Sequence, residues 1–399
     1  MNTFVDESVL VNEYIKHTNL PVNRKGFHIR DILREYWKPF LRDNPHLDIR
    51  PVVLKSIDNI LKCRTIDNGY FFYECKECDD YFMVLHTCKD RFCNSCGVKY
   101  AKERANSVNS ILIDCKHRHI TFTIPDSLRH YFRRDRRRLN ILFEAVNQTF
   151  KYMLKKHAKS KKYQAGFISV IHTFGRALTF NVHIHSIISE GMVDCLGNFK
   201  HLKYFNYELL RKSFMKSLLD LLHKELGNSF YKEKCQLYRD NDEGFYVHAP
   251  GTNSDFKEYS ELVKYVLRYT GRPPMAESRI LNVDYKNDLI TYFYEPHEDD
   301  HLPENEKTGP VEVTEHIYEF IKKLIIHIPE HQFKTIRYYG LYSSKGRTLI
   351  PNYKKKLNYR KYLFNTKHRF MLLEVFKYDI LKCRCGATMK LNIKSSYFP

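Results

Sequence analysis

The chain has 399 residues, with 66 Lys and Arg against 46 Asp and Glu, so its formal net charge is +20. Hydrophobic residues make up 43%, which suffices for a core, and no apolar run approaches the ~18 residues of a membrane span. The N-terminus lacks the basic and apolar stretches of a secretory signal. We therefore expect a cytoplasmic protein without a membrane partner. Its positive charge and its 29 Tyr and 27 Phe favour single-stranded nucleic acid as the partner.

Apolar spacing along the chain predicts a mixture of helices and strands. Strands are expected at 119–125, as a hairpin of 166–175 with 177–191, and on both sides of 286–288. Helices are expected at 29–40, 52–61, 127–157, 207–226, 259–269 and 313–328, with an acidic loop at 295–313. Because hairpins and helices replace regular βα units, the order predicts an α+β fold with an antiparallel sheet.

Five cysteines between residues 75 and 96 have the spacing of a zinc ribbon. Two Cys-x2-Cys pairs lie about fifteen residues apart, and each can supply two thiolates to one tetrahedral Zn²⁺. The simplest site uses the four outer cysteines, which leaves Cys88 and His86 as further candidates for the same site or for a second ion. These ligands are Cys75, Cys78, Cys93 and Cys96. We expect structural zinc here, since four thiolates leave no position open for catalysis.

The remaining cysteines give weaker signals. Cys383 and Cys385 are closer together than the cysteines of a normal knuckle, which leaves open whether this pair binds metal. The others are expected to be buried apolar residues: Cys63, Cys115, Cys195 and Cys235.

A strand carrying two histidines is the most informative segment. Around residues 178–185 the residues alternate, so one face is apolar and the other carries His183 and His185. Two imidazoles held side by side on a rigid strand favour metal binding. His117 and His119 form a second His-x-His pair, but without a bulky apolar residue between them.

A pair of tyrosines lies downstream, at Tyr265 and Tyr269 in the predicted helix 259–269. At positions i and i+4 both phenols share one helix face. Together with a metal-binding pair and a basic surface, they are the parts of a nuclease that uses tyrosine as its nucleophile. The cations expected to contact DNA are Lys264, Arg268, Arg272, Arg133 and Arg137.

At this point the chain resembles the HUH endonucleases, specifically two-tyrosine rolling-circle insertion-sequence transposases, which are related to Helitrons. The resemblance runs from about Cys75 to the C-terminus. It is carried by the cysteine region, His172-Thr-Phe-Gly before His183-Ile-His185, Tyr265-x3-Tyr269 before Arg272-Pro-Pro, and Ile336-Arg-Tyr-Tyr-Gly340. Cys383-Arg-Cys385 is one residue shorter than the Cys-x2-Cys usual there.

This resemblance implies an antiparallel palm with the His pair on its central strand, a catalytic Mg²⁺ or Mn²⁺, and cleavage of single-stranded DNA at transposon ends through a 5′-phosphotyrosine. His172 would be the third metal ligand. The expected domains are an N-terminal helical segment (1–62), a zinc-binding domain (63–112), the tyrosine endonuclease (113–295) and a basic, helical C-terminal region (296–399). A bacterial, DNA-associated protein is implied.

Two other functions remain open. A plasmid replication initiator would use the same chemistry, and a helicase in either case must be a separate host protein, since no Gly-x4-Gly-Lys-Ser/Thr loop occurs in the chain. A non-catalytic, zinc-dependent DNA-binding protein would explain the cysteines and the charge. It would not explain why His and Tyr pairs occur together.

Overall fold

The computed structural model describes residues 26–158, 163–202, 204–249, 263, 266, 274–295, 309–348 and 381–399, which form two compact units. One unit comprises the described parts of Met1–Glu103, Gly271–Ile328 and Leu363–Pro399, and the other those of Arg104–Thr270 and Pro329–Tyr362. Each unit therefore combines distant segments, unlike the four consecutive segments expected from the sequence. Within the described residues, no helix has both the length and the apolar character needed to cross a membrane.

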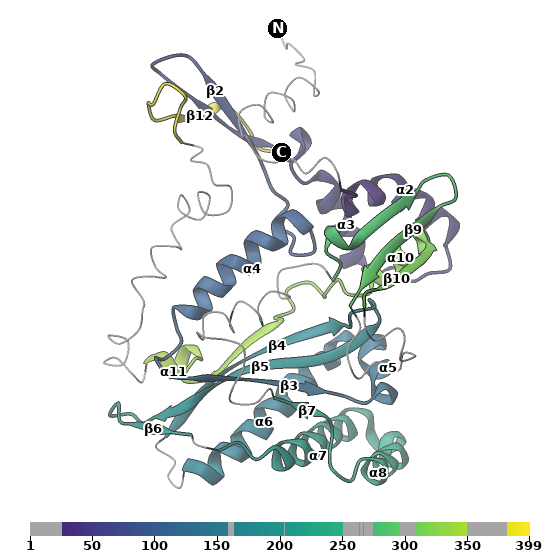
Figure 1. Ribbon diagram of the computed structural model, residues 1–399, viewed down its shortest axis with the longest axis vertical. Helices are drawn as coiled ribbons and strands as arrows, with labels where there is room; N and C mark the ends of the chain where they lie inside the picture. Colours follow the sequence, from purple (N-terminus) through teal and green to yellow (C-terminus); the bar gives the residue numbers. More distant parts are fainter. Residues whose placement is uncertain are drawn as a thin grey trace. The chain divides into compact units, whose positions relative to one another are not determined.

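The second unit is built on an antiparallel sheet with the strand order β11-β4-β5-β3-β7, and β6 pairs with the end of β5 (Figure 1). The predicted hairpin is present as its two longest strands, and the strand predicted at 119–125 is the third. The strands are β3 (His117–Thr123), β4 (Gln164–Phe174), β5 (Phe180–Val193), β6 (Phe199–His201), β7 (Val247–His248) and β11 (Ile336–Gly340). The α+β class with antiparallel sheets is confirmed.

Helices cover one face of this sheet, as Figure 1 shows for α6 and α7. Phe122 of β3 packs edge-on against Phe150 of α6 and Phe214 of α7, so this face is sealed by aromatic rings. The helix expected at 127–157 is interrupted at Asp135, whose carboxylate accepts a hydrogen bond from the Arg137 backbone N–H and caps a 3-10 turn. The helices are α5 (Asp126–Arg134), α6 (Leu139–Ala158), α7 (Tyr207–Leu226), α8 (Tyr231–Asp240) and the short α11 (Ser344–Thr348).

The opposite face of the sheet carries a hydrophobic cluster. Ile168 and Val170 of β4 and Ile187 of β5 pack with side chains from segments far away in the sequence. These partners include Ala105 and Val108 from the last turns of α4 (Asn94–Asn109), Val263, Val266, and the fully buried Tyr342. Both faces of the sheet are therefore covered over this part of its length.

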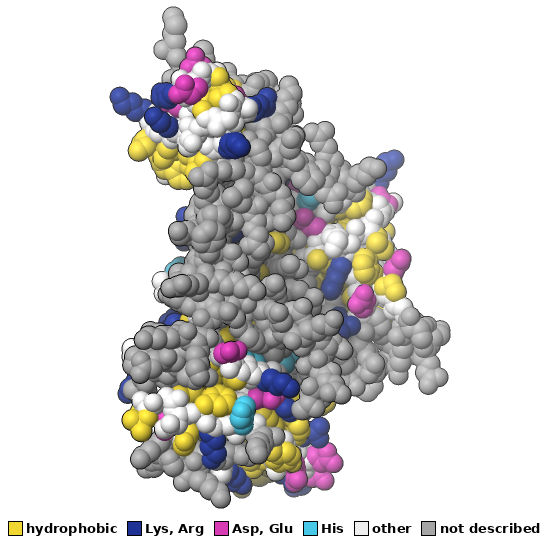
Figure 2. Space-filling model, turned by 60° about the vertical axis from the view of Figure 1, so that its left-hand side comes forward, with side chains coloured by type: hydrophobic (Ala, Val, Ile, Leu, Met, Phe, Trp, Pro, Cys, Tyr) yellow, Lys and Arg dark blue, Asp and Glu magenta, His cyan; other side chains and the backbone are white. Residues whose placement is uncertain are grey.

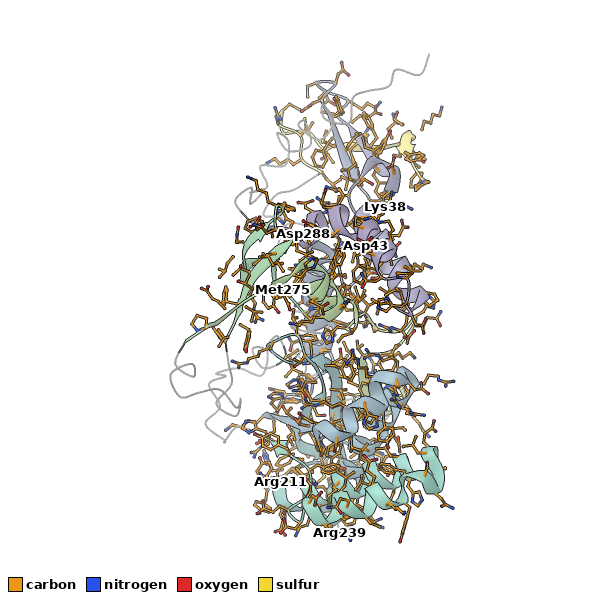
Figure 3. The ribbon with its side chains drawn as sticks, turned by 90° about the vertical axis from the view of Figure 1, so that its right-hand side faces the viewer. Lys38, Asp43, Arg211, Arg239, Met275 and Asp288 are labelled. Carbon is orange, nitrogen blue, oxygen red and sulfur yellow. The ribbon has the colours of Figure 1, made fainter. Side chains whose placement is uncertain are left out.

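In the first unit, helices α2, α3 and α10 accompany a small antiparallel sheet. Tyr36 of α2 donates a hydrogen bond to Asp288 (2.7 Å), and Tyr318 donates to Asp43 (2.8 Å); Figure 3 labels both acids. These bonds connect α2 to the β8–β9 turn and to α10. The elements are α2 (Ile29–Asp43), α3 (Pro51–Lys62), β8 (Ile280–Asp284), β9 (Leu289–Tyr294), β10 (Val311–His316) and α10 (Ile317–Ile325).

One helix boundary expected in this unit is wrong. Residues 313–316 belong to β10, and α10 begins only at Ile317. Val311–His316 pairs with β9 in continuous antiparallel register, because Val311, Val313 and Glu315 alternate with exposed residues as a strand requires. The His316 ring then caps the helix by accepting the Tyr318 backbone N–H.

A separate three-stranded sheet in this unit has the order β12-β1-β2. Its strands are β1 (Tyr70–Glu74), β2 (Tyr81–Leu85) and β12 (Lys390–Tyr397). The end of the expected helical C-terminal region is therefore a strand that pairs with β1, as the yellow and blue ribbons in Figure 1 show.

Candidate active site and metal centres

Three histidines lie on the face of the sheet opposite the helices. His183 and His185 alternate with buried apolar residues along β5, and His172 of β4 is in register with His183 across the strand pair. Their ligand nitrogens all lie within 4.8 Å of one another, which is close enough for one metal ion. The structure thus brings together all three histidines expected to bind a metal.

Hydrogen bonds orient both histidines of β5 and fix the tautomer of His183. His183 Nδ1 lies 3.0 Å from the Asn181 carbonyl oxygen, which can only accept, so this nitrogen carries the proton. His185 Nδ1 lies 2.8 Å from Nε2 of His119 and 3.1 Å from the Thr121 hydroxyl. In metal sites, a hydrogen-bond partner on the ring nitrogen that does not bind the ion orients the imidazole and sets its tautomer. His183 can then offer its Nε2 lone pair to an ion, and His185 can do so in the tautomer in which its Nδ1–H donates to His119.

Burial keeps these imidazoles neutral. Desolvation, with a smaller contribution from the charge of Arg129, lowers the pKa of His183 to about 4. Burial and the neighbouring imidazoles hold the pKa of His185 well below its ordinary value. Burial also lowers the pKa of His119 to about 4. Because only a neutral imidazole binds metal, the site is ready to bind at neutral pH.

His119 and Arg129 were not among the residues predicted from the sequence. His119 belongs to the second His-x-His pair, on β3, which adjoins β5 in the sheet. His119 and His185 stack with ring centroids 5.0 Å apart. The pairing of β3 with β5 brings the His119 ring to His185. A single sequence does not reveal this pairing, so the role of His119 could not be predicted. Arg129 lies on α5 and forms an ion pair with Asp126.

The predicted nucleophiles lie outside the described residues. This holds for Tyr265 and Tyr269 and for the cations Lys264, Arg268 and Arg272. Val263 and Val266 of the same segment are helical and buried, as expected for anchoring residues. They pack with Ile168, Val170 and Ile187, which occupy the histidine face of the sheet.

Other candidate side chains have identifiable partners or remain exposed. The Tyr342 hydroxyl is 2.5 Å from His117 Nε2 and is buried, which gives it a structural role. Arg137 forms an ion pair with Asp135, while Arg133 is exposed at the end of α5. Lys and Arg side chains are spread over the face of the molecule shown in Figure 2.

The cysteines form two groups rather than the single predicted site. Cys63 joins Cys88, Cys93 and Cys96, whereas Cys75 and Cys78 lie with Cys383 and Cys385. The prediction that Cys75, Cys78, Cys93 and Cys96 share one ion is therefore wrong. His86 belongs to neither group, and its Nδ1 bonds to the Asn68 carbonyl.

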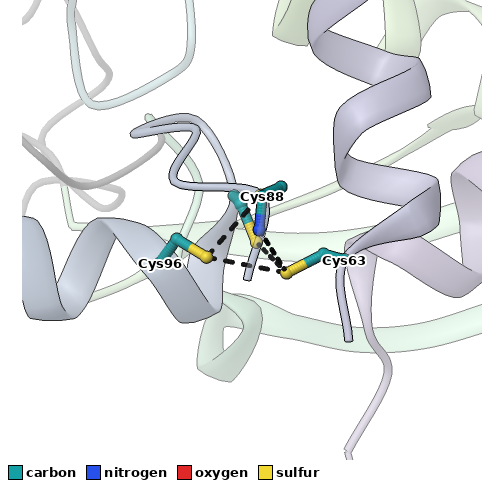
Figure 4. Close-up of side chains that lie close together, drawn as sticks. Cys63, Cys88 and Cys96 are labelled. Atoms are coloured by element: carbon teal, nitrogen blue, oxygen red, sulfur yellow. Dashed lines mark hydrogen bonds between the residues drawn. The ribbon is translucent and has the colours of Figure 1, made fainter. Parts of the chain in front are cut away.

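In the first group, Sγ of Cys96 lies 3.6 Å from Sγ of both Cys63 and Cys88 (Figure 4), and Cys93 lies 3.9 Å from Cys63. A tetrahedral zinc–thiolate site with bonds of about 2.3 Å requires sulfur separations of about 3.8 Å. Cys63 caps the end of α3, and Cys96 lies in the first turn of α4, where the helix dipole favours a thiolate.

The expectation for the unassigned cysteines was only partly right. Cys63 is buried, but it lies within a thiol cluster. Cys195 is exposed, and Cys115 and Cys235 are half-buried. None of these last three belongs to a metal-binding group within the described residues.

We predict that Cys63→Ser removes one zinc ion per chain, because it deletes one of four thiolates from the first group. Cys115→Ser, outside both groups, is the matched control and should keep the wild-type zinc content. Elemental analysis of both purified variants measures the difference. Full zinc content in Cys63→Ser would instead support the arrangement predicted from sequence spacing.

The lowered histidine pKa values predict weak pH dependence of metal binding. With the pKa of His183 at about 4 and that of His185 held well below its ordinary value, both imidazoles stay neutral down to pH 6, so Mn²⁺ affinity should barely change between pH 7.5 and 6. Two imidazoles of ordinary pKa 6.5 would lose roughly tenfold over this interval. The free Mn²⁺ signal in electron paramagnetic resonance measures the affinity, with His183→Ala as the control that should not bind. A tenfold loss would contradict neutral imidazoles at His183 and His185.

The lowered pKa of His119 also predicts how folding stability depends on pH below about 6.5. Since the folded pKa of His119 lies below that of the unfolded chain, protons bind the unfolded state preferentially as the pH falls below about 6.5. The free energy of unfolding therefore decreases from about pH 6.5 towards pH 4.

Comparison with known proteins agrees with this arrangement. A family profile described as "Putative transposase" matches residues 166–348, and a profile described as "Transposase zinc-binding domain" matches residues 32–124. The first match contains the three clustered histidines, and the second contains the whole first cysteine group. No solved structure matches the chain significantly.

Two curated relatives cover most of the chain. The "Transposase for insertion sequence element IS801" of Pseudomonas savastanoi pv. phaseolicola is 27% identical over 309 residues, which are 74% of this chain and 72% of the relative. The "Putative transposase y4qJ" of Sinorhizobium fredii is 22% identical over 344 residues, 81% of this chain and 82% of the relative. The chain therefore belongs to the IS91/IS801 family of rolling-circle transposases with an N-terminal zinc-binding domain, which implies DNA strand transfer.

Proposed function

We propose that this transposase nicks and joins single-stranded DNA at transposon ends, with a metal held by His172, His183 and His185 and with Tyr265 and Tyr269 as nucleophiles. The observation that carries the proposal is the position of Val263 and Val266. Both are buried on the sheet face that carries the histidines, and Tyr265 directly precedes Val266 in the sequence.

Helix geometry supports a role for both phenols. On an ideal helix, positions 265 and 269 share a face that lies roughly 110° around the axis from the stripe formed by positions 263 and 266. Side chains at this angle flank the buried stripe instead of pointing directly away from the sheet. Two phenols on one face can therefore approach the same phosphate in turn.

The donor set suits a transition metal. Three imidazole nitrogens favour Mn²⁺ over Mg²⁺, which prefers oxygen ligands and retains its water. Such an ion would polarise the scissile phosphate and offset its negative charge. Three protein ligands leave further coordination positions open to phosphate oxygens. The Arg129 guanidinium, close enough to His183 to lower its pKa, adds positive charge beside the site.

The proposed reaction exchanges one phosphodiester bond for another. The tyrosine oxygen, having lost its proton, attacks phosphorus and forms the bond to the 5′-phosphate, while the bond to the 3′ oxygen breaks and that oxygen gains a proton. No redox change occurs, and the energy of the phosphodiester is kept for joining. With the first tyrosine holding one 5′ end, the second can cleave another strand. Replication initiation would use the same steps, but the transposase relatives favour transposition.

We predict that His183→Ala or His185→Ala reduces nicking by roughly 100-fold or more, because each removes a metal ligand. Binding of the same single strands should stay within about twofold, since Lys and Arg contacts with phosphate dominate affinity. The assay uses oligonucleotides tiled across the element's ends with Mn²⁺. His130→Ala, at an exposed histidine on α5, is the control and should nick normally. Normal nicking by either site variant would refute the metal role.

The tyrosine pair gives a separate test. Combining Tyr265→Phe and Tyr269→Phe should eliminate the covalent protein–DNA adduct, because both hydroxyl nucleophiles are removed while the rings remain. Each single variant should retain some cleavage but transpose poorly, since strand transfer uses both phenols. Tyr338→Phe on β11 should form normal adduct. Peptide mapping of the trapped adduct by mass spectrometry decides the assignment, and an adduct on Tyr338 or Tyr342 would overturn it. A protein that binds but forms no adduct would be a non-catalytic DNA-binding protein.

A further inference from the structure

The second cysteine group joins two short loops that are distant in the sequence. Cys75 and Cys78 lie between β1 and β2, whereas Cys383 and Cys385 precede β12. Sγ of Cys75 is 3.6 Å from Sγ of Cys385, and Sγ of Cys78 is 3.5 Å from Sγ of Cys383. A disulfide would require about 2.05 Å, whereas zinc tetrathiolates require about 3.8 Å. The four free thiols therefore have the spacing of metal ligands.

Both loops have the backbone of a metal-binding turn. The Cys75 N–H donates to the Asp80 carbonyl, and the Cys383 N–H donates to the Ala387 carbonyl, so each loop is closed by a backbone hydrogen bond. Asp79 directly follows the first pair with φ +55°, and Gly386 directly follows the second with φ +93°. A left-handed residue after the second cysteine reverses the chain and directs both thiols to the same side. The short spacing of Cys383 and Cys385 does not prevent this.

The buried apolar packing around these loops is small. The buried cluster consists of Cys75, Phe82, Cys383 and Met389, so two of its four members are thiols. The strand that follows is mostly exposed, with Leu391 at 42% and Ile393 at 68% exposure. In small domains with so little core, bound metal commonly supplies the missing stability.

We propose that Cys75, Cys78, Cys383 and Cys385 bind a second structural Zn²⁺, which fastens β12 to β1. The ion completes a contact that backbone pairing begins: Glu74 pairs with Lys390, and Asn392 donates a hydrogen bond to Glu74. The cysteines of the C-terminal pair lie outside both segments matched by the family profiles. This site is independent of the first cysteine group and of the histidine site.

Zinc content tests the proposal. Combining Cys383→Ser with Cys385→Ser should leave one zinc fewer per chain than wild type. The matched control combines Cys195→Ser with Cys235→Ser, which lie outside both groups, and should match the wild-type content. Wild-type zinc content in the Cys383/Cys385 double variant would overturn the proposal.

Thiol reactivity in the wild-type chain tests it without a substitution. Cys78 and Cys385 are as accessible as Cys195, since all three are exposed. In the zinc-loaded protein, iodoacetamide should modify Cys195 much faster than Cys78 and Cys385, and a metal chelator without reductant should abolish this protection. Modification of all three at equal rates would overturn the proposal. Protection that only a reductant removes would mean disulfides and would also overturn it.

Discussion

The opposite chemistry of the two faces of β5 is the constraint on which the histidine site depends. Val182 and Ile184 are buried on one face, while His183 and His185 alternate with them on the other. The aromatic and aliphatic packing on the first face fixes the strand and so fixes where the imidazoles project. Taking imidazoles out of water costs free energy that is tolerable only for the neutral form with its N–H group hydrogen-bonded. The Asn181 carbonyl accepts the N–H of His183, and Nε2 of His119 is the hydrogen-bond partner of His185 Nδ1. Burial and hydrogen bonding together therefore keep these imidazoles neutral and oriented, as the proposed metal ligands would need to be.

Features encoded by short-range patterns could be predicted from the sequence. Strict alternation located β5 and its histidines, and helical spacing gave α7 at 207–226, as the structure has it. The grouping of cysteines could not be predicted, because it depends on how α3 and the C-terminal loop return to the β1–β2 hairpin. Cys63 looked like an ordinary core residue, since nothing local relates it to Cys96, 33 residues away. His119 was missed for a related reason: its role follows from the pairing of β3 with β5 and not from its neighbours in sequence.

The hydrophobic cluster on the histidine face connects the palm-like sheet to the segment that contains the tyrosines. A metal site can polarise a phosphate, but a nucleophile held even 1 Å out of position loses much of its effect. Val263 and Val266 bury their side chains among β-branched residues of β4 and β5. One of these residues, Val170, is in register with His185 across the strand pair. Rigid packing of this kind would suit the proposed use of two phenols in succession. The same cluster also contains the buried Tyr342, whose hydroxyl forms a hydrogen bond with His117. Tyr342 therefore has a structural role in this cluster.

The two cysteine groups differ in how they can assemble during synthesis. The first spans Cys63 to Cys96, a separation of 33 residues, so all of its ligands emerge from the ribosome close together. In the second group, 305 residues separate Cys78 from Cys383. Loop closure over such a distance carries a larger entropic cost, though the cost grows only with the logarithm of loop length. A second zinc ion would offset this cost with metal–thiolate bonds, which the small exposed sheet cannot replace by apolar burial. The β1–β2 hairpin would thus exist with two unused thiols until the C-terminal loop arrives, and the sheet would be completed only then.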